Sequence, residues 1–333
     1  MKRHKICKII LAILSVFLCV AFYELIGICI TYKKQPAVSD ATIKETQNIM
    51  SVAGRENTER AVIIEKNSQA LLERVRLIQN AKDEIILSTF AFKSDESGKL
   101  ILGALHDAAD RGVHVRILVD GMESWIDMEG NPYFYGLSSH ENVEIKLYNK
   151  ANPLKPWKTM GRMHDKYLIA DGKIYILGGR NTYNYFLGDF PGHKNFDRDV
   201  LVVCDEPQKD NSVNQLWNYF ETIWEQEDCR YFHNSKKLAD RQSVKKAVLE
   251  LQEGYQQYFE VNKEKICDTD YADETFETEK ITLLSNPIHT QAKEPVVWYQ
   301  LGELMKNAKE RVKIHTPYIC LLYTSPSPRD ISG

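Results

Sequence analysis

The feature that most constrains this chain is an uninterrupted apolar stretch near its N-terminus. Ile9–Ile30 comprises 22 residues with one charged side chain, Glu24. As a helix this stretch would be about 33 Å long, enough to cross a hydrocarbon core of about 30 Å. We therefore expect residues 1–34 to form an N-terminal transmembrane anchor. The largely polar residues 35–62 are expected to form a linker.

The charges that flank the apolar stretch favour one orientation. Four basic residues precede it and two follow it: Lys2, Arg3, Lys5, Lys8, then Lys33 and Lys34. This bias favours a single-pass protein of the cell membrane with a cytoplasmic N-terminus and the rest of the chain outside. A cleaved signal peptide is the alternative. It is disfavoured because the run is longer than a usual h-region and Ala21–Ile30 contains no A-x-A-like cleavage site.

Composition excludes some classes of function. The formal net charge is −3, so no overall basic field would attract nucleic acid, and a nucleic-acid partner is not expected. Seven cysteines occur without C-x-x-C spacing, which indicates neither a zinc site nor a disulfide framework. We expect no metal and no cofactor.

Beyond the linker, helical and strand patterns alternate. Short apolar runs at Glu84–Phe92, Val113–Asp120 and Val143–Tyr148 predict buried strands, and amphipathic segments between them predict helices. Such alternation predicts an α/β fold with a mixed β-sheet flanked by helices. We assign residues 63–275 to this first lobe.

The pattern then restarts. Leu77–Phe92 (LIQNAKDEIILSTFAF) and Leu304–Ile319 (LMKNAKERVKIHTPYI) share five identical positions at an offset of 227 residues. This similarity predicts a duplicated domain, with residues 276–319 as the start of a second lobe. Residues 320–333 contain CLLYTSPSPRD, which resembles the translation of a sequencing adapter. We interpret this segment as a non-native tail and the chain as truncated near Ile319.

The residues that indicate chemistry lie in Met163–Asn181, MHDKYLIADGKIYILGGRN. In a strand, His164 and Lys166 would share one face. Asp171-Gly172 predicts a tight turn, after which a return strand would bring Gly178, Gly179 and Asn181 beside the start. An imidazole, an ammonium group and an amide could then converge on one anion.

These residues resemble the motif of the phospholipase D superfamily, H-x-K-x4-D-x6-G-[GS]-x-N, as found in cardiolipin synthases. All the fixed positions of the motif are matched, by His164, Lys166, Asp171, Gly178, Gly179 and Asn181. The resemblance implies that His164 attacks phosphorus to form a phosphohistidine, or else serves as the acid. It implies phosphate binding by Lys166, Gly179 and Asn181, and an organising role for Asp171 within the catalytic set.

Two further expectations follow from the resemblance. Asp199 would hold the far ring nitrogen of His164; alternatively it pairs with Arg198 or Arg162. The family builds one site from two motifs, so a second one would come from the missing C-terminal half or from a homodimer mate.

Three functions are compatible with this pattern. The membrane anchor favours a phospholipid substrate, with headgroup hydrolysis or phosphatidyl transfer as the reaction. A nuclease of the same superfamily is the second interpretation, disfavoured by the acidic charge balance. A non-catalytic, membrane-tethered interaction protein is the third.

Overall fold

Nine strands among the described residues form one mixed sheet. The computed structural model describes residues 2–51 and 59–314. The strand order is β8-β4-β3-β2-β5-β6-β7-β1-β9. The strands are β1 Glu59–Ile64, β2 Glu84–Thr89, β3 His114–Asp120, β4 Val143–Tyr148, β5 Tyr167–Ala170, β6 Ile174–Gly178, β7 Asp199–Cys204, β8 Cys229–Tyr231 and β9 Phe276–Glu277. The predicted α/β class with a mixed sheet is confirmed.

The sheet combines a parallel and an antiparallel half. β2, β3 and β4 run parallel, so their carboxyl ends meet at one edge of the sheet. β5 pairs antiparallel with β2, and β6 and β7 continue antiparallel. The junction between β2 and β5 therefore lies at the centre of the sheet.

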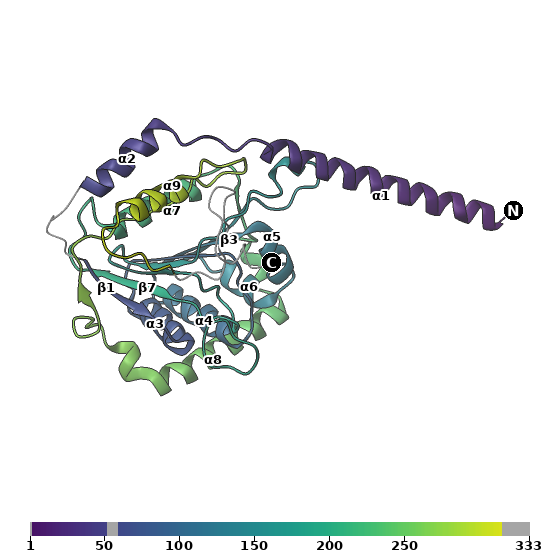
Figure 1. Cartoon of the computed structure of the whole chain (residues 1–333). Coiled ribbons are helices and arrows are strands. Elements are labelled where there is room, and N and C mark those ends of the chain that lie inside the picture. The colour runs from purple at the N-terminus through teal and green to yellow at the C-terminus, as the bar shows by residue number, and fades with distance from the viewer. Residues whose placement is uncertain (1, 52–58, 315–333) are drawn as a thin grey trace.

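Helices cover both faces of the sheet because its strands are apolar on both sides. Side chains such as Ile117 and Leu168 pack against one helical layer, and Leu118 and Ile169 pack against the other. Figure 1 shows α3, α4 and α8 on one side and α7 with α9 on the other. The helices here are α3 Asn67–Asn80, α4 Glu96–Asp110, α5 Gly121–Asp127, α6 Pro132–Ser138, α7 Ser212–Trp224, α8 Gln242–Cys267 and α9 Val296–Asn307.

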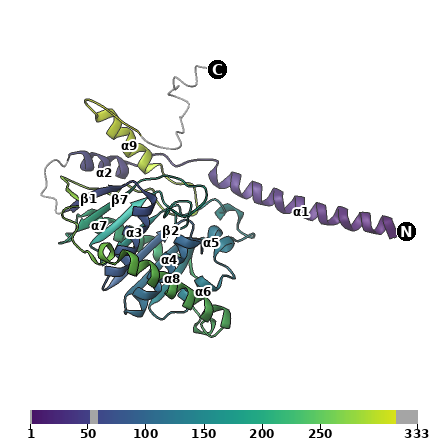
Figure 2. The ribbon, with the colours of Figure 1, turned by 90° about the horizontal axis from the view of Figure 1, so that it is seen from below.

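The N-terminal helix stands away from this body. α1 spans Lys2–Tyr32 and projects from the domain in both views (Figures 1 and 2). Within the described residues, one helical stretch, Lys5–Tyr32, is long and apolar enough to cross a membrane, with a mean hydropathy of 2.7. Most of its apolar side chains are exposed, from Ile6 to Ile30, and its C-terminal part contacts the domain.

Three details differ from the expectations. Residues 40–51 of the expected linker form α2, and Glu59–Ile64 already belongs to the sheet because β1 pairs with β7. The strand expected through His164 and Lys166 begins only at Tyr167. In the repeated segment α9 supplies the expected helix, residues 308–314 are irregular, and the remainder lies outside the described residues.

The core on the α3 and α4 side generates a stability prediction. Ile117 on β3 is completely buried, whereas Ile63 on β1 is exposed. We expect Ile117→Ala to lower the free energy of unfolding by about 2–5 kcal/mol, because it removes buried carbon and leaves a cavity. Ile63→Ala should change it by less than about 0.5 kcal/mol. Urea unfolding in detergent measures both, and equal losses would contradict the layer arrangement.

Candidate active site

All the motif residues except Asp171 lie at one end of the β5–β6 hairpin. His164 and Lys166 lie just before β5, and Gly178 ends β6. The N–H of Gly178 donates to the carbonyl of Lys166 at 3.1 Å, which joins the two segments. Although residues 161–166 are not a strand, the hairpin still brings both halves of the motif together.

The ring of a phenylalanine, Phe90, lies close to the side chains of His164, Lys166 and Arg162. Phe90 follows β2, and its ring lies 4.6 Å from the imidazole of His164, centroid to centroid. The ammonium group of Lys166 lies 5.2 Å from the same ring centroid, and the guanidinium of Arg162 lies 5.0 Å from it. Sequence reasoning missed Phe90. The sequence feature that could have identified it is an aromatic residue at the carboxyl end of a central strand.

One cavity of about 390 Å³ connects these groups to solvent. His164, Asp165 and Lys166 line it from the motif side. The opposite wall is a segment of irregular structure between residues 283 and 293, with Lys293 among its lining residues. His164 and Lys166 thus face the same space, as their spacing predicted, but Asp165, expected on the opposite face, lines this space too.

The surroundings shift the protonation of both basic groups. Lys166 is only 6% exposed, and burial lowers its pKa to about 8. Partial burial and, secondly, the neighbouring ammonium of Lys166 lower the pKa of His164. At neutral pH the site therefore combines a neutral imidazole with a charged ammonium group.

The amide and glycine positions have distinct physical reasons. Asn181 is buried, and its Oδ1 accepts the N–H of Ala91 at 3.2 Å, which fixes the side chain. A Cβ on Gly179 would lie 2.0 Å from a carboxylate oxygen of Asp197. A side chain at position 179 would therefore require the carboxylate of Asp197 to move.

Asp171 lies at the far end of the hairpin. Its carboxylate accepts the backbone N–H groups of Lys82, Asp83 and Glu84 at 2.9, 2.8 and 3.0 Å. β5 separates this turn from His164 by about 13 Å at about 3.3 Å per residue. Asp171 therefore lies away from His164 and binds the backbone of residues 82–84, a placement compatible with the organising role expected of it.

Asp199 differs from both predicted roles. Its buried carboxylate lies 2.9 Å from Arg74 and 3.2 Å from Arg180, and the arginine side chains are also buried. Arg198, one alternative partner, pairs with Glu65 instead. Asp199 therefore neutralises buried guanidinium groups, and the predicted contact with the imidazole of His164 is not found among the described residues.

Asp120 fixes the segment that carries the histidine. Its carboxylate accepts the N–H of Met163 at 3.1 Å and lies 2.7 Å from the guanidinium of Arg162. The same carboxylate caps α5 through the N–H groups of Met122 and Glu123. Sequence reasoning did not assign Asp120 to the site. The feature that could have identified it is an aspartate at the end of a parallel strand.

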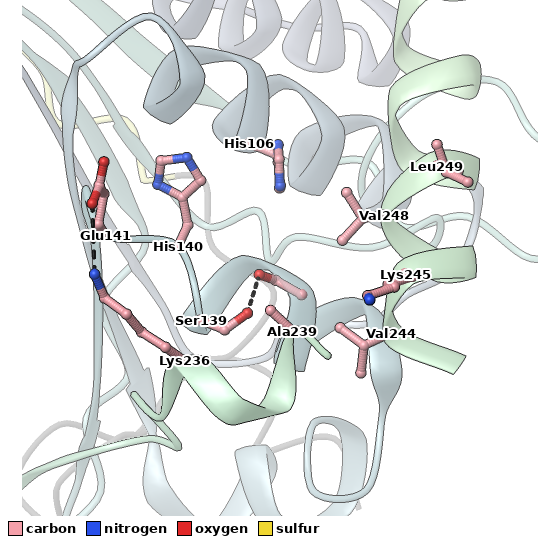
Figure 3. A pocket seen from close by; sticks show the side chains of 11 residues that line it. His106, Ser139, His140, Glu141, Lys236, Ala239, Val244, Lys245, Val248 and Leu249 are labelled. Carbon is pink, nitrogen blue, oxygen red and sulfur yellow. Dashed lines mark hydrogen bonds and ion pairs between the residues drawn. The ribbon is translucent and has the colours of Figure 1, made fainter. Parts of the chain in front are cut away.

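A larger cavity, of about 590 Å³, lies at the other end of the sheet (Figure 3). His106 and His140 lie near it, and each ring is within 3.2 Å of a carboxylate oxygen of Asp110. His140 and Glu141 precede β4, at the amino end of the parallel strands. This cavity contains none of the motif residues.

Part of the chain is similar to known proteins. Residues 75–224 match the family described as cardiolipin synthase, PLD-like domain. A protein of Helicobacter pylori is 33% identical over 181 residues, which are 50% of this chain and 35% of that protein. Cardiolipin synthase C of Escherichia coli is 29% identical over 154 residues, 42% of this chain and 31% of that enzyme. The chain thus spans about a third of the length of these relatives.

Among solved structures, NucT from Helicobacter pylori matches with a TM-score of 0.41 and 17% identity, covering 52% of this chain and 99% of that one. Phosphatidylserine synthase from Haemophilus influenzae matches with a TM-score of 0.45 and 15% identity, covering 66% and 48%.

The mixed sheet, the hairpin and the family match define a phospholipase D-like α/β domain. The residues that the family model covers, 75–224, belong to the phospholipase D superfamily and are cardiolipin synthase-like.

The placement of Asp171 generates a prediction about stability. Asp171→Ala removes the acceptor of three backbone N–H groups, so we expect the free energy of unfolding to fall by about 1–3 kcal/mol. Asp171→Asn keeps one carbonyl oxygen and should lose less. Urea unfolding compares the variants, and an unchanged unfolding midpoint for Asp171→Ala would contradict the structural role.

Proposed function

We propose that this chain is a membrane-anchored enzyme that acts on the phosphodiester of phospholipids. The reaction is headgroup hydrolysis or transfer of the phosphatidyl group to a second alcohol. The observation that carries the proposal is the common cavity of His164 and Lys166, which pairs a neutral imidazole with a buried cation. A phosphodiester is anionic, and such a pair both attracts it and presents a nucleophile.

In the proposed reaction, a ring nitrogen of His164 attacks phosphorus. A phosphorus–nitrogen bond forms, the bond to the headgroup oxygen breaks, and the leaving alcohol takes a proton from an acid. Water or a second alcohol then attacks phosphorus, gives its proton to the group that served as the acid, and releases the imidazole as the phosphorus–nitrogen bond breaks. Lys166, the N–H of Gly179 and the amide of Asn181 would bind the phosphoryl oxygens.

The acid belongs, in this proposal, to a second motif. Residues 276–319 would begin a second lobe, and its motif would come from further sequence or from another copy of the chain. Residues 63–275 would then be the first catalytic lobe, with residues 35–62 as its linker and residues 320–333 as a foreign tail.

The proposed anchor is α1, whose length and hydropathy suit a bilayer. The basic residues before it favour a cytoplasmic N-terminus with the lobe outside. Anchoring the site beside a bilayer raises the effective concentration of a lipid substrate.

A substrate with a p-nitrophenol leaving group tests the nucleophile without its acid. p-Nitrophenolate departs unprotonated, so the full chain in detergent should release a burst of up to one equivalent from phosphatidyl-p-nitrophenol. Slow steady-state turnover should follow. Mass spectrometry should locate the phosphatidyl adduct on His164. His164→Ala should abolish the burst, whereas His114→Ala, at the amino end of β3, should retain it.

A nucleotide ester provides the second arm of this experiment. Thymidine 5′-(p-nitrophenyl phosphate) replaces the lipid ester in a parallel reaction. A burst from the nucleotide ester alone would favour a nuclease and contradict the lipid proposal. No burst from either ester would favour a non-catalytic tethered protein.

The shifted pKa values predict a bell-shaped pH profile for the burst rate constant divided by the dissociation constant of the substrate. The rate should rise with pH as His164 loses its proton, with a midpoint below the usual value of about 6.5. It should fall around pH 8 as Lys166 loses its proton and its charge. Lys166→Arg keeps the charge, so its alkaline limb should move to higher pH. An unchanged alkaline limb in this variant would remove Lys166 from the phosphate site.

A further inference from the structure

The loop that precedes the motif packs directly on the apolar helix. The hydroxyl group of Tyr23 in α1 donates to the carbonyl of Leu154 at 3.2 Å. A Cβ placed on Gly27 would lie 2.5 Å from Cγ of Pro156, so the helix and the loop are in close contact. The loop comprises residues 151–160 and includes the short helix η1, Pro156–Lys158.

The position of this contact along α1 sets the depth of the loop. A hydrocarbon core of about 30 Å needs about 20 helical residues at about 1.5 Å each. Counted from Ile9, which follows the last basic residue before the apolar stretch, these 20 residues end near Ile28. Tyr23 would then lie about 8 Å inside the outer boundary and Gly27 about 2 Å inside it. A loop that touches both residues must reach the boundary region of the same bilayer.

The side chains of the loop suit that depth. Leu154 is 78% exposed, and Trp157 and Met160 are also exposed, so three large apolar groups lack cover in the described structure. Tryptophan is favoured at membrane interfaces because it combines an apolar ring with a polar N–H. Lys155 is exposed beside them and could reach anionic headgroups.

The backbone of the loop is also compatible with an apolar boundary. Its N–H groups donate within the loop, from Lys155 to Asn152, from Lys158 to Lys155 and from Thr159 to Pro156. Prolines at positions 153 and 156 have no N–H to satisfy. These three N–H groups and the two prolines leave no free donor to be desolvated at their positions when the loop enters the lipid boundary.

We infer that residues 151–160 form a second membrane contact, in which Leu154, Trp157 and Met160 enter the outer boundary of the bilayer beside α1. This inference rests on the proposed anchoring role of α1. Arg162 and His164 follow the loop directly, so the contact holds the mouth of the cavity at the level of the phospholipid headgroups. The bilayer that α1 crosses would then also present the substrate.

Quenching of tryptophan fluorescence tests the contact independently of catalysis. The full chain is reconstituted into phosphatidylcholine–phosphatidylglycerol vesicles with brominated acyl chains. Trp157→Phe should lower the quenched fraction at least twofold relative to the unmodified chain. Trp298→Phe is the matched control, because Trp298 on α9 is 59% exposed against 41% for Trp157, and it should not lower the quenched fraction.

The alternatives give different results. Equal quenching in both variants would show that Trp157 does not touch lipid and would overturn the inference. Protection of Trp157 from both bromolipid and aqueous iodide would indicate a protein partner, such as a second copy, and would overturn it as well.

Vesicle flotation separates this failure from failure of the anchor, because a chain that does not float with vesicles contradicts the anchoring role itself. The p-nitrophenol burst reports on the catalytic proposal separately.

Discussion

The buried carboxylate of Asp120 is the constraint on which the site depends. Residues 161–166 have no strand partner, so a sheet ladder does not fix His164. Asp120 instead holds Arg162 by its guanidinium and Met163 by its N–H. Asp120 is the last residue of β3, which pairs with the central strand β2, and its carboxylate also caps α5. Its position is therefore fixed by both the sheet and the helix. A histidine outside regular structure is thereby held against Phe90 by a carboxylate with several partners.

A second buried charge cluster supports the other half of the motif. Asp199 sits between Arg74 and Arg180, and a Cβ on Gly178 would lie 2.0 Å from its Oδ1. Three charged side chains in the interior are tolerable only as a paired group, and the glycine provides the space for it. The glycines of the motif thus reflect close carboxylates, Asp199 at one position and Asp197 at the next.

Local patterns predicted the fold well. Strand periodicity located β3 and β4 almost to the residue, and the H-x-K spacing identified two groups that line one cavity. Partners distant in sequence were not predictable in the same way. The pairing of Asp199 with Arg74 joins residues 125 positions apart, and nothing in the motif encodes that contact. The strand expected through His164 begins later because the ends of strands depend on neighbouring chains, which periodicity does not report.

The charge of the whole chain and the charge of the cavity have opposite signs. The net charge is −3, but Arg162, Lys166 and Lys293 all line the cavity beside His164. Of the carboxylates nearby, Asp120 pairs with Arg162. Burial raises the pKa of Asp165. The carboxylate of Asp165 also accepts a hydrogen bond from the hydroxyl of Tyr219 at 2.8 Å. The charge of Asp120 is therefore paired and that of Asp165 is suppressed. The ammonium of Lys166 donates only to a backbone carbonyl among the described residues. The positive field of these side chains acts over a few ångströms in a partly buried site, because screening by salt is weak there. A chain with a net negative charge can therefore still bind an anionic phosphodiester at this one position.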